Sequence, residues 1–266
     1  MSNKDVVTSE YSLLFGDCLE RVKEIPDGSV DLILTDPPFG TTKCSWDSVI
    51  DLDSMWEELK RVIKPNGAIL LFAQTPFDKV LGASNLNMLK YEWVWEKTTA
   101  TGHLNAKKAP MKAHENILVF YKKLPTYNPQ KTQGHVRKTS TADRSKLNGE
   151  CYGTQEGVTV YDSTDRYPRS VQLFSTDKQR VSLHPTQKPV ALLEYLIKTY
   201  TNENETVLDF TAGSMSTAIA CINTNRKGVM IEKDEHYFKV GSDRVAQALQ
   251  ELGDDRINQA LNEKEN

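Results

Sequence analysis

Short apolar runs alternate with amphipathic segments along most of the chain. Seven of these runs predict β-strands, at residues 11–15, 30–35, 68–72, 92–95, 116–121, 206–210 and 228–232. The segments between them carry apolar residues at helical spacing. Strands that alternate with helices are typical of an α/β sheet, whereas sandwiches and helical bundles lack this alternation. The pattern therefore predicts an α/β fold.

Three helices are predicted with defined ends. The clearest places six apolar side chains on one face, at intervals of three and four residues: Leu52, Met55, Trp56, Leu59, Val62 and Ile63. The Lys-Pro-Asn-Gly segment at 64–67 then ends this helix. The second helix begins at Pro189, since proline suits a first turn, and runs to about Thr201. The third begins near Ser214, and the apolar faces of all three are expected to be core.

The stretch 124–183 differs from the rest because Thr, Ser, Gln, Lys, Asp and Gly dominate it and the apolar periodicity fades. Aromatic residues are dispersed through it: Tyr127, Tyr152, Tyr161, Tyr167 and Phe174. A structureless loop of this length is uncommon inside a compact domain. We therefore expect an inserted region between 1–123 and 184–266, which folds as a small module, orders on binding or stays partly mobile.

Length and composition exclude several classes of protein. With 266 residues the chain can bury a hydrophobic core without disulfides or a structural metal. Its longest apolar runs, such as 68–73, are too short to cross a bilayer. Its start lacks the basic and apolar regions of a secretory signal, so we expect a cytoplasmic protein with no membrane partner. Neither the cysteines (Cys18, Cys44, Cys151 and Cys221) nor the five histidines show metal-ligand spacing. The sequence predicts reduced thiols and no metal site.

The segment Asp36-Pro37-Pro38-Phe39 directly follows the apolar strand 30–35, at the end of the strand where open α/β sheets bind ligands. Two successive prolines fix φ and remove two backbone donors, so the turn offers acceptors only, the Asp36 carboxylate and the Pro37 carbonyl. Such a turn suits an amino group, and Phe39 could stack on the flat ring that carries it. An ordinary strand-ending turn is the alternative, since Asp-Pro commonly opens turns.

A second candidate site follows the strand 206–210. A turn that contains Gly213 leads into the helix near Ser214, and the first backbone N–H groups of a helix suit a polar ligand. Glu232 ends the next strand, nineteen residues after Gly213, where it can accept two ribose hydroxyls. The pair suits a nucleoside cofactor. The alternative is a structural glycine that lets the helix pack closely against the strand.

These residues resemble motifs of the S-adenosylmethionine-dependent DNA amino-methyltransferases. Asp36-Pro37-Pro38-Phe39 is similar to the family's Asp-Pro-Pro-Tyr/Phe motif, in the form typical of enzymes that methylate adenine N6. Further similar segments follow in the order of the β class, with the catalytic motif before the cofactor-binding one: 14–18, 114–120, 184–189, 207–214 and 229–232. The resemblance covers most of residues 10–245 outside the insert.

The resemblance implies a Rossmann-like, seven-stranded methyltransferase sheet that is circularly permuted. The catalytic half, 1–123, would precede the cofactor-binding half, 184–266, which includes an acidic tail. Between them, 124–183 would form an inserted target-recognition region.

The resemblance also implies a set of residues that bind S-adenosylmethionine. Asp17 and Cys18 would meet the cofactor adenine, and Lys188 belongs to a segment, with His184 and Thr186, that closes over its methionine part. The set is completed by Asp36, Asp209, Phe210, Gly213, Ser214 and Glu232. Lys188 could hold the methionine carboxylate, and a solvated lysine at a helix entry is the alternative.

The cofactor loop departs from the family pattern Asp-Pro-Phe-x-Gly-Ser-Gly-Thr. Phe210 stands in place of the proline, Thr211 in place of the phenylalanine and Met215 in place of the second glycine. A side chain at position 215 could crowd the cofactor. Because Asp209 and Gly213-Ser214 remain, we still expect cofactor binding.

The implied reaction acts on a base that is rotated out of double-stranded DNA. The Asp36 carboxylate and the Pro37 carbonyl would each accept one N–H of the target amino group, and Phe39 would stack on the ring. Pro38 completes the catalytic set, and no covalent intermediate is needed. Cytosine N4 is an alternative target, because it presents the same pair of N–H groups. A nucleotide-dependent dehydrogenase would need the Gly-x-Gly-x-x-Gly fingerprint, which is missing. A non-catalytic DNA-binding module would follow if Met215 blocked the cofactor.

The net charge of −3 conceals a basic segment, since residues 103–150 contain ten lysines and arginines against three acidic residues. A solvated loop is one explanation of this charge, and contact with DNA phosphates is the other. The expected DNA contacts are Lys107, Lys108, Lys112, Lys131, Arg137 and Lys138. A homodimer is compatible with the family. The chain shows no second catalytic constellation, so no obligatory nuclease partner is expected.

Overall fold

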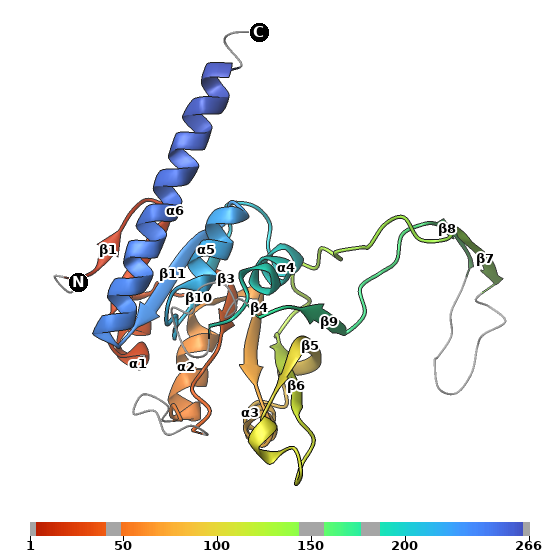
Figure 1. Cartoon of the computed structure of the whole chain (residues 1–266), viewed down its shortest axis with the longest axis horizontal. Helices are drawn as coiled ribbons and strands as arrows, with labels where there is room; N and C mark the ends of the chain where they lie inside the picture. The colour runs from red at the N-terminus through yellow and green to blue at the C-terminus, as the bar shows by residue number, and fades with distance from the viewer. Residues whose placement is uncertain (1–3, 41–48, 144–156, 177–186, 263–266) are drawn as a thin grey trace. The chain divides into compact units, whose positions relative to one another are not determined.

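The computed structural model describes residues 4–40, 49–143, 157–176 and 187–262, with the side chains of the last helix described to residue 253. Its largest element is a nine-stranded sheet in the order β1-β2-β11-β10-β3-β4-β6-β5-β9 (Figure 1). The strands of this sheet are β1 (Val6–Val7), β2 (Tyr11–Phe15), β3 (Val30–Thr35), β4 (Ile63–Ala73), β5 (Leu89–Thr101), β6 (Lys112–Phe120), β9 (Val171–Phe174), β10 (Thr206–Asp209) and β11 (Lys227–Glu232). The helices are α1 (Cys18–Arg21), α2 (Leu52–Val62), α3 (Phe77–Ser84), α4 (Val190–Tyr200), α5 (Ser216–Asn223) and α6 (Glu235–Asn262), with short 3₁₀ turns η1 (Val22–Glu24) and η2 (His103–Asn105).

All strands of this sheet except β1 and β6 run in the same direction. The central strand β3 is parallel to both of its neighbours, β10 and β4, whereas β6 is antiparallel to β4 and β5. The carboxyl ends of β2, β3, β5, β10 and β11 therefore lie at one edge of the sheet, together with the amino end of β6. The residues that directly follow β2, β3, β5, β10 and β11, and those that directly precede β6, therefore lie close together at this edge.

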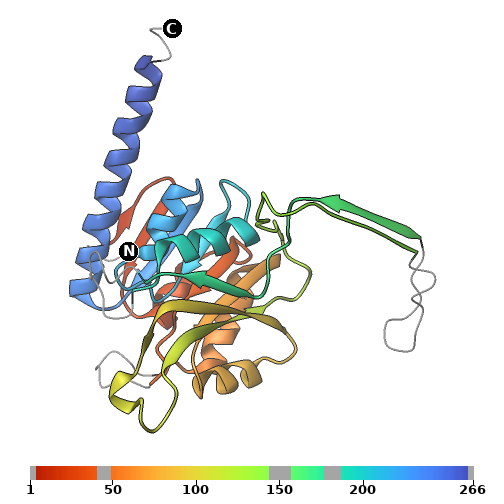
Figure 2. The same ribbon diagram turned by 45° about the vertical axis from the view of Figure 1, so that its right-hand side comes forward.

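Helices cover both faces of the sheet (Figure 2). On β3, Leu32 and Leu34 pack in a buried cluster with side chains of α4, α5 and α6, whereas Ile33 packs in a second cluster with α1, α2 and α3. A strand that is buried on both faces has a largely apolar sequence, and Val30, Leu32, Ile33 and Leu34 fit this pattern, with the half-buried Asp31 as an exception. None of the helices in the described part of the chain has both the length and the apolar character of a membrane span.

The predicted fold class is confirmed, and each of the seven predicted strands is present. The sheet has nine strands rather than seven because β1 and β9 extend its two edges. Both are short and partly exposed, so they lack the apolar runs that predicted the others. The helix predicted from Leu52 to Ile63 ends one residue earlier, at Val62, and Ile63 together with 64–67 belongs to β4 instead of forming a turn.

The chain separates into two compact units, one of Met1–Asn128 with Ser170–Asn266 and the other of Pro129–Arg169. The second unit is therefore shorter than the predicted insert, 124–183. The segment after Ser170 lies in the main unit because β9 pairs with β5, with Val171 opposite Val94. Within the second unit, β7 (Lys138–Asp143) and β8 (Val158–Ser163) form an antiparallel hairpin.

Candidate active site

A cavity of about 680 Å³ lies at the sheet edge where these strand ends meet. Open α/β sheets bind ligands at this edge because the chain leaves each parallel strand there and the connecting loops diverge. Every described residue that the sequence assigned to catalysis or to the cofactor lines the cavity: Asp17, Cys18, Asp36, Pro37, Pro38, Phe39, Lys188, Asp209, Phe210, Gly213, Ser214 and Glu232. His184 and Thr186 lie outside the described residues.

Asp36 is held at the end of β3 by contacts on its backbone and on its side chain. Its carbonyl accepts the Thr211 hydroxyl at 3.0 Å, which ties this turn to the loop after β10. One carboxylate oxygen, Oδ2, accepts a hydrogen bond from the Lys188 ammonium. The other, Oδ1, is buried and has no hydrogen-bond partner among the described residues. Because a buried acceptor without a donor is costly, Oδ1 is suited to receive a ligand N–H.

Lys188 also links Asp36 to a cluster of buried charges. Its Nζ lies 3.2 Å from Glu115 Oε2, and Lys97 Nζ lies 2.5 Å from Glu115 Oε1. The Gln74 amide donates a hydrogen bond of 2.8 Å to Glu115 Oε1. The side chains of Glu115, Lys97 and Lys188 are each less than a tenth exposed. Two ammonium groups thus balance two carboxylates inside the cavity wall.

Burial and the charges of this cluster shift the pKa values of its two carboxyl groups in opposite directions. Burial raises the pKa of Asp36 to about 6, although Lys188 opposes that rise. Burial also opposes the ionisation of Glu115, but Lys188 and Lys97 outweigh it and lower its pKa to about 2. Burial disfavours the charge of Lys188 as well, yet its two carboxylate neighbours hold its pKa above the ordinary value. Glu115 is therefore the permanent anion of the cluster, and Asp36 is the carboxyl that titrates closer to neutral pH.

Sequence reasoning had not singled out Lys97, and it had placed Glu115 only within a similar segment of strand. A signal was present in each case: one lysine follows the apolar stretch that ends at Trp95, and one glutamate precedes a run of five apolar residues, 117–121 being Ile-Leu-Val-Phe-Tyr. The contact of Lys188 with two protein carboxylates also differs from the contact with a cofactor carboxylate that the sequence suggested.

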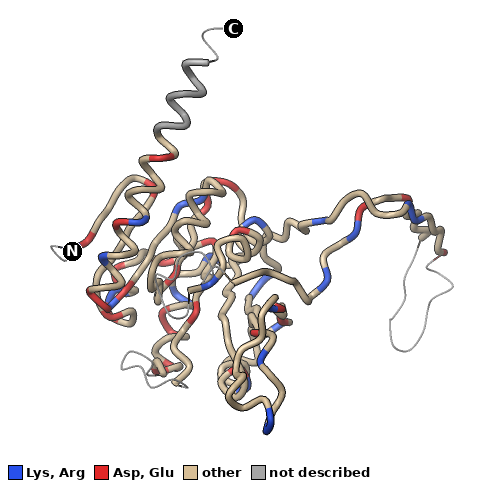
Figure 3. Tube along the Cα trace, viewed as in Figure 1, with Lys and Arg blue, Asp and Glu red and all other residues tan. Residues whose placement is uncertain are grey.

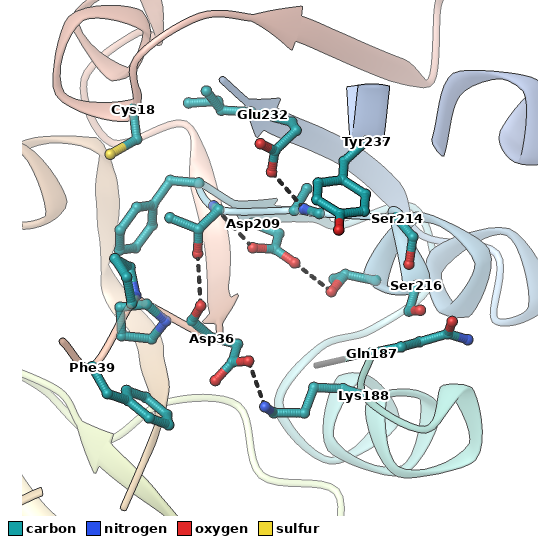
Figure 4. A pocket seen from close by; sticks show the side chains of 18 of the residues that line it. Cys18, Asp36, Phe39, Gln187, Lys188, Asp209, Ser214, Ser216, Glu232 and Tyr237 are labelled. Carbon is teal, nitrogen blue, oxygen red and sulfur yellow. Dashed lines mark hydrogen bonds and ion pairs between the residues drawn. The ribbon is translucent and has the colours of Figure 1, made fainter. Parts of the chain in front are cut away.

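Glu232 and the loop after β10 form the other wall of the cavity. The Gly213 N–H donates to Glu232 Oε2 at 2.8 Å, and the Asp234 N–H donates to Oε1 at 2.7 Å. Gly213 has φ of +52°, a conformation that favours glycine. In Figure 4, Glu232 and Tyr237 lie on one side of the view and Asp36, Phe39 and Lys188 on the other, with Asp209 between them.

Asp209 stabilises this loop from within the core. Its carboxylate accepts hydrogen bonds from the hydroxyls of Thr35 and Thr217, the latter at 2.6 Å, and from the Thr211 N–H at 3.2 Å. Asp209 is only 5% exposed, so its carboxylate mainly joins β3, β10 and α5. The carboxyl end of β10 is thereby fixed beside that of β3.

Met215 does not line the cavity, although it replaces a glycine of the family pattern. Its backbone has φ of +58° at the N-cap of α5, so it adopts the left-handed conformation for which glycine is usual. Its side chain is fully buried and packs against Gly241 of α6. Met215 therefore keeps the backbone form of the turn and leaves the cavity open.

Asp17 and Cys18 lie at the end of β2, where Asp17 caps α1 by accepting the Leu19 N–H at 3.0 Å. Burial raises the pKa of the Cys18 thiol to about 11, so it is a neutral thiol at physiological pH. Cys18 therefore contributes an apolar wall and no nucleophile. Cys44, which follows the Asp36-Pro37-Pro38-Phe39 turn in the sequence, lies outside the described residues.

The lysines expected to contact DNA in the main unit are Lys107, Lys108 and Lys112, and all three are exposed in the turn between β5 and β6 or at its edge. In the second unit, the Lys131 ammonium lies 4.6 Å from the centre of the Tyr167 ring. Arg137 donates two hydrogen bonds to the Asp162 carboxylate, at 2.7 and 2.6 Å, so its charge is already paired.

A sequence profile of a family described as DNA methylase matches residues 30–243 of the chain. The protein named DNA adenine methyltransferase YhdJ, of Escherichia coli (strain K12), is 30% identical over 88% of this chain and 82% of its own length. Type II methyltransferase M.HpaI, of Haemophilus parainfluenzae, is 29% identical over 89% of this chain and 74% of its own length.

Solved structures share the fold. The M1.HpyAVI–SAM complex superposes with a TM-score of 0.63 at 23% identity and covers 88% of this chain and 98% of its own. The PvuII DNA methyltransferase (cytosine-N4-specific) superposes with a TM-score of 0.65 at 16% identity, over 91% and 92% of the two chains. At these identities the likeness concerns the fold alone.

Proposed function

The chain belongs to the DNA methylase family, and from this premise we propose that it transfers the methyl group of S-adenosylmethionine to N6 of adenine at specific sites in double-stranded DNA. One observation carries the proposal. Asp36, whose buried Oδ1 has no hydrogen-bond partner in the described part of the chain, lines the same cavity that Glu232 and the Gly213 loop line from the other side. An acceptor for an amino group and a site for a nucleoside thus share one enclosed space.

The residues of the cavity fit this cofactor. Its volume, about 680 Å³, lies within the range of roughly 300–1,000 Å³ that is usual for small-molecule sites. Glu232 uses one lone pair of each oxygen for a backbone N–H, and about two of the four lone-pair sites of a carboxylate remain to accept ribose hydroxyls. Asp17, Cys18 and Phe210 supply the wall for an adenine ring. When bound, the cofactor supplies an electrophilic methyl group.

The remaining residues hold the target base. Asp36 Oδ1 accepts one N–H of the exocyclic amino group, and the Pro37 carbonyl accepts the other. This geometry turns the nitrogen lone pair away from the ring and leaves it available for the methyl group. Phe39, which lies 5.4 Å from Phe77 between ring centres, is supported from behind and stacks on the base. Alignment of two bound reactants can supply about 7–11 kcal/mol of the barrier, so positioning is the main catalytic contribution.

Adenine is favoured over cytosine by two observations. The motif reads Asp-Pro-Pro-Phe, the form typical of enzymes that methylate adenine N6. The relative YhdJ is named a DNA adenine methyltransferase. Cytosine N4 is the alternative, because its amino group presents the same two N–H donors to Asp36 and Pro37, and the cytosine-N4-specific PvuII enzyme shares the fold.

We assign site recognition to the second unit, Pro129–Arg169, and the phosphate contacts to Lys131 and Lys138 in that unit and to Lys107, Lys108 and Lys112 in the main unit. Arg137 would have to exchange Asp162 for a phosphate. The protein is proposed to act without a nuclease partner, and a homodimer is compatible with this function.

The test is the product. Unmethylated DNA is incubated with the purified protein and S-adenosylmethionine, digested to nucleosides and analysed by mass spectrometry. Detection of N6-methyladenine supports the proposal. Detection of N4-methylcytosine instead would show that cytosine is the target base, and the absence of both products refutes the proposal. Methylome sequencing of cells that express the protein, beside cells that express Asp36→Ala, identifies the recognition site.

A further inference from the structure

Leu104, in the turn between β5 and β6, exposes 87% of its surface to solvent. Single exposed apolar residues are common on soluble proteins, so this exposure alone decides nothing. Its surroundings are unusual in three respects: the order of the turn, its position beside the cavity and its charge.

The turn that carries Leu104 is held by its own backbone. The Asn105 N–H donates to the Gly102 carbonyl at 2.9 Å, and the Ala106 N–H donates to the His103 carbonyl at 3.1 Å. Gly102 enters the turn with φ of +90°, which a residue with a side chain rarely adopts. Leu104 is therefore presented on an ordered support, which reduces the conformational entropy lost when it binds a partner.

The turn continues one wall of the active-site cavity. Strand β5 contributes Trp95, Lys97, Thr99 and Thr101 to that wall. Leu104 follows Thr101 by three residues, and three residues span at most about 11 Å. A ligand too large to enter the cavity, such as the duplex from which a base has been extruded, would meet this turn at the entrance.

The same turn is positively charged. No acidic residue occurs between Lys97 and His114 in the sequence, whereas Lys107 and Lys108 are exposed and pair with no carboxylate among the described residues. Figure 3 shows this basic end of the β5–β6 turn in blue. Exposed lysines around an apolar side chain suit a ligand that has negatively charged phosphates and an apolar space between its stacked bases.

We propose that Leu104 is a wedge, which enters the duplex and fills the space left by the extruded target base. The inference rests on the proposed function. Extrusion costs a few kcal/mol of stacking and pairing, and proteins that distort duplexes insert Leu, Met or Phe between base steps to offset such a cost. Lys107 and Lys108 hold the neighbouring phosphates, and Leu104 stabilises the opened duplex. Leu104 acts on DNA structure and is a positioning residue.

The experiment compares Leu104→Ala with Leu86→Ala. Leu86 is a matched control because it is 67% exposed and precedes β5 by three residues, whereas Leu104 follows β5 by three. The 13 residues of this strand separate them by about 40 Å. Two duplexes carry a site that the unaltered protein methylates in genomic DNA. In one duplex the target base is paired, and in the other it faces an abasic position, where extrusion breaks no base pair.

Leu104→Ala should lower the methylation rate constant on the paired duplex at least about tenfold, or about 1.4 kcal/mol, and leave the rate on the abasic duplex within about twofold. Leu86→Ala should leave both rates within about twofold. In a binding assay without turnover, 2-aminopurine at the target position should brighten with the unaltered protein and with Leu86→Ala, and much less with Leu104→Ala.

An equal loss on both duplexes, or no loss on the paired one, would overturn the wedge while leaving the methyltransferase function intact. Undiminished 2-aminopurine brightening with Leu104→Ala would overturn it as well. If the unaltered protein methylates neither genomic DNA nor duplexes, the proposed function itself fails, and that result appears before any variant is made.

Discussion

The Met215 side chain occupies the space beside Gly241, so that a Cβ at position 241 would lie 2.6 Å from Met215 Cγ and 3.1 Å from its Cβ. The turn before α5 and helix α6 are therefore fitted to each other. A methionine in the left-handed conformation costs about 1–2 kcal/mol. Burial of the Met215 side chain against Gly241, a position of α6 that carries no side chain, offsets this cost.

Gly241→Ala should therefore lower the free energy of unfolding by about 1–3 kcal/mol, because the new methyl group overpacks the contact with Met215. The sign is informative, since alanine ordinarily stabilises a helix interior by about 1 kcal/mol relative to glycine. Gly253→Ala in the same helix is the control, because its new Cβ would meet no described atom within 4 Å apart from the adjacent helix backbone. That variant should be neutral or more stable in chemical denaturation.

The raised pKa of Asp36 predicts the pH dependence of the reaction. Only the ionised carboxylate can accept an amino N–H on Oδ1 while Oδ2 accepts the Lys188 ammonium, so kcat/KM should rise with pH through about 6 and level off above it. Asp36→Asn should abolish methyl transfer and leave binding of S-adenosylmethionine largely intact. Substantial turnover in that variant would contradict the role of Asp36.

Lys188→Met should move this acid limb to higher pH. The ammonium of Lys188 favours the ionised form of Asp36, so its removal leaves burial and Glu115 to raise the pKa further. Lys64→Met is the control, because Lys64 pairs with Asp31 away from the cavity wall. An unchanged midpoint in Lys188→Met would show that the two groups do not interact in solution.

Glu115→Gln should lower the free energy of unfolding at neutral pH by about 3–5 kcal/mol, since it leaves Lys97 and Lys188 with too few buried anions. The pKa of Glu115 is lowered from 4.5 to about 2 in the folded protein, so its stabilisation is present above 4.5 and is lost as pH falls toward 2. Unfolding measured between pH 7 and pH 3 should therefore be less pH-dependent in the variant. Glu20→Gln, at an exposed surface pair, should change little.

Glu115 also marks the limit of what the sequence could predict. The strands buried on both faces, such as β3, have largely apolar sequences, and β3 was predicted with its observed ends. Asp36, Gly213 and Glu232, which the sequence places at or after strand ends, line one cavity because parallel strands share an edge. The partner of Lys188 was not predictable, since Glu115 lies on an antiparallel strand and reaches that edge from its amino end.

The second limit concerns strands that are held by pairing rather than by burial. The four residues of β9 alternate between exposed and half-buried, and they join the sheet through their hydrogen bonds to β5. Their composition resembles that of the insert, so the sequence assigned them to it.

The third limit concerns Met215, which the sequence presented as an obstacle to the cofactor. Its side chain packs against Gly241 instead, and because Gly241 is 26 positions away in the sequence, this contact follows only from the fold.

Glu232→Ala should weaken binding of S-adenosylmethionine at least about tenfold in calorimetry. The variant removes the proposed acceptor for ribose hydroxyls and also releases the N–H groups of Gly213 and Asp234 that the carboxylate orders. Glu235→Ala, three residues later and exposed beside Lys4, should bind the cofactor normally. Normal binding by Glu232→Ala would place the cofactor elsewhere.

The salt dependence of DNA binding tests which basic side chains contact phosphates. The slope of log K against log salt concentration is negative, and each phosphate contact makes it steeper by about 0.9. The double variant Lys107→Ala with Lys108→Ala should therefore make the slope shallower by about 1.8. Arg137→Ala should reduce it much less, because Asp162 already neutralises the guanidinium through two hydrogen bonds. Fluorescence anisotropy with a labelled duplex measures both slopes. An equal reduction in the two variants would mean that Arg137 leaves Asp162 when DNA binds, and an unchanged slope in the lysine variant would remove the β5–β6 turn from the DNA interface.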